Sequence, residues 1–189
     1  MEHQTTVHRK SHSPPRHHIR SHDLYNQPRE KTWCPWTHTS PPDNSPEYTF
    51  HIVGSPTPKA DFTHTADLAA YLLETIRHPE LSENRTLNLV SDRLSYEDIA
   101  VLLERYSGYR VRRNVMSVEV MHRVLRDPGE APREVREEAS VFPVDFWFLV
   151  RGLQGEGRFW RARGEVHNEL FPGVRVRTFE GYLRELFGV

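Results

Sequence analysis

Residues 86–108, TLNLVSDRLSYEDIAVLLERYSG, contain the clearest structural pattern in the chain. The short apolar run at residues 86–91 predicts a strand. Ser95, with Asp98 three residues later, resembles the capping box that begins a helix. One face of that helix would then carry Ile99, Leu102, Leu103 and Tyr106. Gly108 stands where a left-handed residue ends a helix. A strand followed by an amphipathic helix is typical of the α/β class.

Similar signals occur on both sides of this stretch. Residues 48–53 and 109–116 have the character of extended segments. Thr65, Ser117 and Thr178 are each placed to cap a helix. We expect about five helices and three short extended segments in all.

Two further local structures are expected near the aromatic residues. Pro132 is suited to the first turn of a helix. That helix would present Val135, Ala139 and Phe142 on one side. A glycine-rich turn is expected after it, formed by Gly152, Gly155 and Gly157.

Residues 1–46 differ in composition from the rest. They contain seven histidines and seven prolines but few aliphatic side chains. Such a segment buries too little apolar surface to offset the entropy cost of ordering it. We therefore predict two parts, a disordered His/Pro-rich head at residues 1–46 and a folded lobe at residues 47–189. The cluster Trp33-Cys34-Pro35-Trp36 is unusual for a disordered tail, and could dock on a partner or on the lobe.

The head also has histidine pairs at a spacing that suits zinc on a helix. They are His8 with His12 and His18 with His22. Prolines interrupt the segment and no second cysteine completes a known pattern, so we expect no metal site. The single cysteine, Cys34, fits a reducing compartment.

Composition gives no indication of a nucleic-acid or membrane partner. The net charge is −1, so no overall positive field would attract nucleic acid or anionic lipid. Residues 141–150 form the longest apolar stretch, about half of the ~20 residues that span a bilayer. We expect a cytoplasmic protein.

Few residues suggest chemistry. Gly152-x-x-Gly155-x-Gly157 resembles a dinucleotide loop but has no strand before it and no helix opening at it. We assign no catalytic residue and no cofactor-binding residue. The candidate substrate pocket consists of Phe142, Phe146, Trp147, Trp160 and His167. The aromatic members could also form core, with different members in core and pocket, and His167 could be a structural histidine or a pocket acid/base.

The order of segments is similar to that of a known family. The matching residues are FTHTADLA at 62–69, LNLVS at 87–91, LSYEDI at 94–99, ELFPGV at 169–174 and TFEGYL at 178–183. Together they resemble the C-terminal part of NmrA-like, isoflavone-reductase-like proteins, which are atypical relatives of short-chain dehydrogenases. The resemblance implies an α/β substrate lobe, mostly helical with a few short strands. It also implies that the Rossmann half, with its NADPH-binding glycine turn and catalytic lysine, is missing.

Three functions follow from this resemblance. The first is the substrate-binding part of an NAD(P)H-dependent oxidoreductase that acts on a small aromatic, secondary metabolite and is inactive alone. The second is a non-enzymatic regulator or protein-interaction module. The third is a lobe that binds or cyclises a small molecule by itself. The face that would cover the Rossmann half is expected to be exposed and to promote self-association or binding of a protein partner.

Overall fold

The computed structural model describes residues 18–20, 23–26, 31–137 and 140–189. These residues form six α-helices and seven short strands, together with several 3₁₀ turns. The helices are α1 Thr65–Arg77, α2 Pro79–Ser82, α3 Tyr96–Ser107, α4 Val118–Arg126, α5 Val144–Gly155 and α6 Phe179–Phe187. The strands are β1 His18–Arg20, β2 Asp23–Leu24, β3 Glu47–Val53, β4 Ala60–Thr63, β5 Thr86–Asn88, β6 Asp92–Leu94 and β7 Arg110–Met116. The mixed α/β class with few short strands is as predicted.

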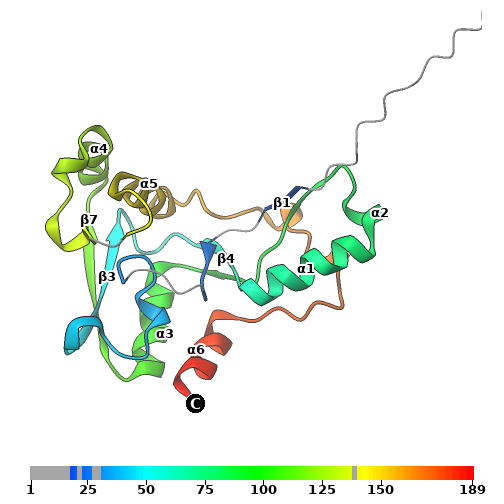
Figure 1. The fold of residues 1–189 in the computed structure, drawn as a ribbon, viewed down its shortest axis with the longest axis horizontal. Helices are drawn as coiled ribbons and strands as arrows, with labels where there is room; N and C mark the ends of the chain where they lie inside the picture. Colours follow the sequence, from blue (N-terminus) through cyan, green and yellow to red (C-terminus); the bar gives the residue numbers. More distant parts are fainter. Residues whose placement is uncertain (1–17, 21–22, 27–30, 138–139) are drawn as a thin grey trace, which may run out of the picture.

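The longest pairing joins β3 and β7, which run parallel over seven residue pairs. Both strands were expected from their extended character. Helices α3, α4 and α5 surround this pair at one end of the elongated molecule (Figure 1). Buried Phe50 and Ile52 of β3 belong to the main hydrophobic core.

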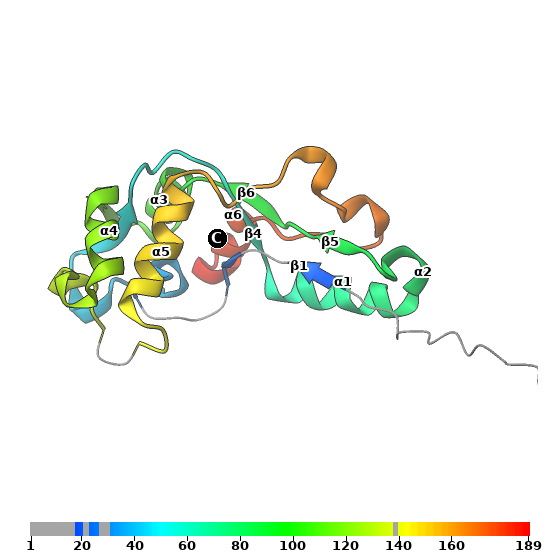
Figure 2. The ribbon, with the colours of Figure 1, turned by 90° about the horizontal axis from the view of Figure 1, so that it is seen from above.

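A second group of elements lies at the opposite end (Figures 1 and 2). Strand β1 pairs with β5 in parallel, and helix α1 lies beside them. A smaller core connects these elements through Tyr71, Leu87, Leu89 and Phe171. The three-stranded sheet β2-β4-β6 lies between the two groups.

The predicted helix ends are largely confirmed. Ser95 and Asp98 form the capping box of α3, and Gly108 ends that helix with φ of 72°. One cap is corrected. The residue that caps α1 is His64, whose Nδ1 accepts a hydrogen bond from the Ala66 backbone N–H, while Thr65 is the first helical residue.

The region around the aromatic residues differs from the prediction. Residues 133–135 form only a 3₁₀ turn, and no α-helix begins at Pro132. The helix begins after Pro143 instead, and continues as α5 through the expected glycine turn. Gly152 and Gly155 lie inside α5, where Gly152 contacts Met121 of α4 and Gly155 contacts the Val53 carbonyl of β3. The missing side chains let three elements approach closely.

Part of the predicted disordered head is ordered. Residues 31–46 are described, and Trp33, Cys34 and Trp36 are almost fully buried in the main core. Trp36 packs edge-on against Phe50 of β3, and its Nε1 donates to the Tyr25 carbonyl at 2.7 Å. The predicted boundary at residue 46 is therefore wrong for this stretch. The expectation for residues 1–17, 21–22 and 27–30 lies outside the described residues.

Candidate functional site

An aromatic cleft opens where the ordered part of the head meets the start of α5. Its volume is about 220 Å³. Its lining residues, which define the aromatic cleft below, are Thr32, Trp33, Val135, Arg136, Glu137, Ser140, Phe142, Val144 and Trp147. Pro143 is the N-cap of α5, so Phe142 precedes the helix and Trp147 lies within it, and both rings contact Trp33.

The rings in this cleft contact one another at their edges. The Trp33 centroid is 5.7 Å from that of Phe142 and 6.4 Å from that of Trp147. Phe146 extends the cluster, 5.4 Å from Phe142. Trp147 is buried, whereas Phe142 and Phe146 remain about two-fifths exposed, at 41% and 42%. An aromatic wall with exposed ring surface suits a flat apolar ligand.

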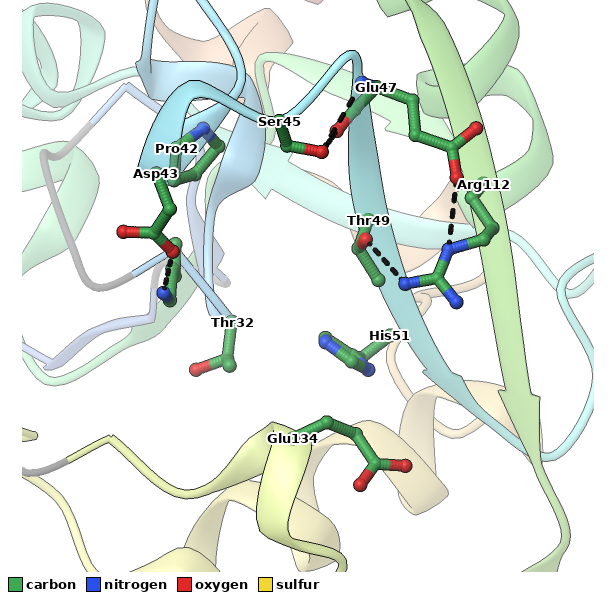
Figure 3. A pocket seen from close by; sticks show the side chains of 10 residues that line it. Thr32, Pro42, Asp43, Ser45, Glu47, Thr49, His51, Arg112 and Glu134 are labelled. Atoms are coloured by element: carbon green, nitrogen blue, oxygen red, sulfur yellow. Dashed lines mark hydrogen bonds and ion pairs between the residues drawn. The ribbon is translucent and has the colours of Figure 1, made fainter.

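A second cleft, the polar cleft, shares Thr32 with the aromatic cleft. Figure 3 shows the polar cleft from close by. Its volume is about 230 Å³. Its lining residues are Lys31, Thr32, Pro42, Asp43, Ser45, Glu47, Thr49, His51, Arg112 and Glu134. The Thr32 backbone N–H donates to Glu137 at 2.7 Å, which fixes the segment between the two clefts.

His51 is the most deeply buried titratable side chain in the polar cleft. It projects from β3 into the space between Thr32 and Glu134 (Figure 3). The residue is 6% exposed, and burial lowers the pKa of His51 to about 4. The imidazole is therefore neutral at pH 7. The Nδ2 group of Asn114, on the paired strand β7, lies 3.0 Å from His51 Nδ1.

Arg151 of α5 contacts two residues of the aromatic cleft, Trp33 and Trp147. It is fully buried and donates to the Trp33 carbonyl and the Tyr96 hydroxyl. Its guanidinium also lies over the rings of Trp33, Tyr96 and Trp147. These contacts hold the Trp33 peptide against α5, so Arg151 positions the aromatic wall.

The structure brings together three of the five predicted pocket residues. Phe142 and Trp147 line the aromatic cleft, and Phe146 packs beside them. Trp160 lies elsewhere, stacked under Arg93 at 5.5 Å. His167 is also elsewhere, because its Nδ1 accepts from the Asn88 backbone N–H at 3.0 Å.

Sequence reasoning missed several members of the two clefts. Trp33 was noted as unusual but was placed in a disordered segment. His51 could have been noticed as a polar residue inside an apolar strand. Glu134 carried no usable signal, because it is one of several charged residues in the run at 133–138.

The glycine run at residues 152–157 does not fit the phosphate-binding loop of a dinucleotide site. A pyrophosphate needs backbone N–H groups at the start of a helix. Gly152 and Gly155 instead occupy the C-terminal half of α5, where they are buried against Met121 and the Val53 carbonyl. Among the described residues no group of His, Cys, Asp or Glu is arranged to hold a metal ion. His8, His12 and His22 lie outside those residues. In the same part of the chain, no helix is both long and apolar enough to cross a bilayer.

Comparison with curated proteins finds plant reductases. The chain is 27% identical over 134 residues to the isoflavone reductase homolog IRL of Zea mays, covering 70% of this chain and 41% of that protein. It is 26% identical over 140 residues to the phenylcoumaran benzylic ether reductase POP1 of Populus trichocarpa, covering 71% and 42%. The chain thus spans less than half the length of these relatives.

Solved structures share the fold. A crystal structure of isoflavone reductase superposes with a TM-score of 0.65 at 17% identity, covering 91% of this chain and 52% of that one. The leucoanthocyanidin reductase–NADPH complex of Vitis vinifera gives a TM-score of 0.62 at 16% identity, covering 93% and 53%.

The sequence profile of the NmrA-like family matches residues 23–183, which includes part of the predicted head. This match confirms the resemblance inferred from the order of sequence segments. The chain belongs to the NmrA-like family.

Proposed function

We propose that this chain is the substrate-binding part of an NmrA-like NAD(P)H-dependent reductase that acts on a small aromatic metabolite. The aromatic cleft carries the proposal. Its wall of Trp33, Phe142 and Trp147 combines buried rings with exposed ring surface. Family membership supports a reductase, and the names of the relatives describe aromatic substrates of those proteins.

The cofactor would be bound by another part of the protein. One structural neighbour holds NADPH, but Gly152 and Gly155 of this chain lie inside α5 and are used for helix packing. We infer that the Rossmann half of the family architecture is missing from these residues. The chain alone should then bind an aromatic ligand without reducing it.

Ligand binding is tested directly by titration calorimetry. An isoflavone, a leucoanthocyanidin and a phenylcoumaran serve as probes. We expect at least one to bind, and Phe142→Ala to weaken that binding several-fold because ring–ring contact is lost. Trp160→Phe, a change outside the cleft, is the matched control and should bind as the wild type does. Absence of binding by all three probes, or an unchanged affinity in Phe142→Ala, would contradict the proposal.

Inactivity is tested in the same samples. With NADPH and a bound probe, absorbance at the nicotinamide band should stay constant. Oxidation of NADPH by the purified chain would show that the cofactor half is not required.

A second candidate is a non-enzymatic regulator or protein-interaction module. It is favoured by the exposed apolar side chains of α1, where Leu72, Leu73 and Ile76 are 43%, 46% and 76% exposed. Such a surface suits a protein partner. This candidate gains if all three probes fail to bind while a specific protein partner is recovered with the intact chain and not with an Ile76→Lys variant.

A further inference from the structure

The polar cleft has a chemistry of its own, distinct from that of the aromatic wall. We propose that it is a hydroxyl-recognition subsite, in which His51 donates a hydrogen bond to a ligand hydroxyl and Glu134 accepts one from it. The inference deepens the proposed function and rests on it, because the hydroxyl would belong to the aromatic ligand.

The donor is defined by the tautomer of His51. The Asn114 side chain meets His51 Nδ1 through its amide NH₂ group, which can only donate. Nδ1 therefore accepts, and the proton of the neutral imidazole is on Nε2. No described residue makes a hydrogen bond with Nε2, and the ring lines the cleft (Figure 3). The cleft thus contains one oriented N–H donor on a rigid strand.

Glu134 is the available acceptor, because the other charged side chains that line the cleft are paired with one another. Lys31 pairs with Asp43, and Arg112 pairs with Glu47 at 3.2 Å and also donates to Thr49. Both cations of the lining are therefore neutralised. Glu134 makes no hydrogen bond or ion pair with the described residues, and it lines the same cleft as His51.

This combination selects against anions. The lining contains two cations and three carboxylates, a net charge of −1. A carboxylate or phosphate would meet an unpaired negative charge beside a neutral donor, which is unfavourable. A hydroxyl group is suited to the cleft, because it can accept from Nε2–H and donate to the Glu134 carboxylate together.

An aromatic ring of the protein lies next to the proposed hydroxyl site, which favours a ligand whose hydroxyl is carried on a ring. The Trp147 ring lies edge-on to His51, with centroids 6.4 Å apart. Trp147 also lines the aromatic cleft. A phenol satisfies both features, since it places a hydroxyl directly on an aromatic ring.

Calorimetry with a matched pair of probes tests the inference. 4-Propylphenol and propylbenzene differ only by the hydroxyl group, so the pair reports both the hydrogen bond from His51 Nε2–H and the hydrogen bond to Glu134. We expect the wild-type chain to bind the phenol about tenfold more tightly, the effect of one hydrogen bond to a charged group. His51→Phe and Glu134→Ala should each reduce that preference to less than about threefold. Glu134 is exposed at the surface, so Glu134→Ala tests the inference even if His51→Phe fails to fold.

The control is His122→Gln, an exposed position on α4, which should keep the full preference for the phenol. If the wild type binds both probes equally, hydroxyl recognition is overturned while aromatic binding stands. If it binds neither probe, hydroxyl recognition is overturned as well. In that case the three metabolite probes decide the proposed function independently.

Discussion

At the scale of single residues, His51 shows how burial sets the state of a titratable group. Burial disfavours the imidazolium, and Arg112, Arg151 and Lys31 lower the pKa further against the opposite effect of Glu134. The pKa of about 4 lies below the ordinary value of 6.5. As the pH falls, the unfolded chain therefore takes up a proton before the folded chain does.

This difference predicts a dependence of stability on pH. The free energy of unfolding should fall as the pH is lowered from 6.5 to 4, with roughly 2–3 kcal/mol lost by pH 4.5 through His51 alone. His51→Gln should remove this part of the pH-dependent loss of stability, because glutamine does not titrate. Urea denaturation at pH 7 and pH 4.5 measures it as the difference between variant and wild type. His122→Gln is the control, and an equal loss in wild type and His51→Gln would contradict the assignment.

Residue-scale prediction from sequence succeeded where the cause was local. Ser95, Asp98 and Gly108 lie within one helix, and their roles follow from short-range hydrogen bonds. The roles of Trp33 and His51 depend on contacts with α5 and β7, which are distant in sequence. No local pattern indicates such contacts.

At the scale of elements, α5 is the helix that places the candidate site. Its first turn contributes Trp147 to the aromatic cleft, and its last turns pack against α4 and β3. Close packing is made possible by Gly152 and Gly155. The same glycines made the sequence look like a turn, because glycine normally disfavours helices.

Alanine substitutions should separate the two contacts. A Cβ at Gly152 would overlap the flexible Met121 side chain, and Gly152→Ala should cost about 1–3 kcal/mol. A Cβ at Gly155 would overlap the Val53 backbone carbonyl, which cannot move independently of β3. Gly155→Ala should therefore be the more destabilising, at about 3 kcal/mol or above. Chemical denaturation provides both values.

Gly164→Ala is the matched control, since a Cβ there meets no atom within 4 Å. It should change stability by less than about 0.5 kcal/mol. Equal stability of Gly152→Ala and Gly155→Ala would show that the backbone contact is not limiting.

The helix expected to begin at Pro132 does not form, and tertiary packing explains why. Ala131 and Val135 are both buried in the main core. The short 3₁₀ turn between them places both side chains inward. Local helix signals cannot indicate this requirement, which comes from the packed neighbours.

At the scale of the whole molecule, aromatic residues from the N-terminal segment contribute to the main hydrophobic core. Composition predicted too little apolar surface for order because it counted aliphatic residues. Tyr25, Trp33 and Trp36 supply large aromatic surfaces instead, and all three are at most 2% exposed. A few aromatic side chains are enough to dock a segment that is otherwise polar.

The end of the molecule that contains β1, β5 and α1 exposes apolar surface. Among the described residues, strand β1 pairs with β5 alone, in a parallel sheet of two strands. Parallel sheets are normally larger and are covered by other elements on both faces. A groove beside β1 is lined by Ile19, Leu72, Thr75, Ile76 and Pro79. We propose that this surface packs against the cofactor-binding half of the family architecture, and that it self-associates when that half is absent.

Sedimentation velocity tests this proposal over a range of concentrations. The wild-type chain should form dimers or larger species as concentration rises, and Leu72→Lys with Ile76→Lys should shift it to monomer. Val189→Lys, at an exposed position far from the groove in sequence, is the control. A wild-type chain that remains monomeric at all concentrations would contradict the proposal.

The parallel pairing of β3 and β7 also constrains the order in which the molecule assembles. His51 and Asn114 are neighbours in space but 63 residues apart in the chain. Parallel strands cannot be joined by a tight turn, so this long loop must close before the pairing yields any stabilisation. Trp36 packs against Phe50 of β3, and that surface is complete only after closure. We therefore expect the long-range closure of β3 on β7 to limit the folding rate, and the tryptophan-containing segment to dock late; a folding rate that Trp36→Phe leaves unchanged while unfolding accelerates would agree with late docking.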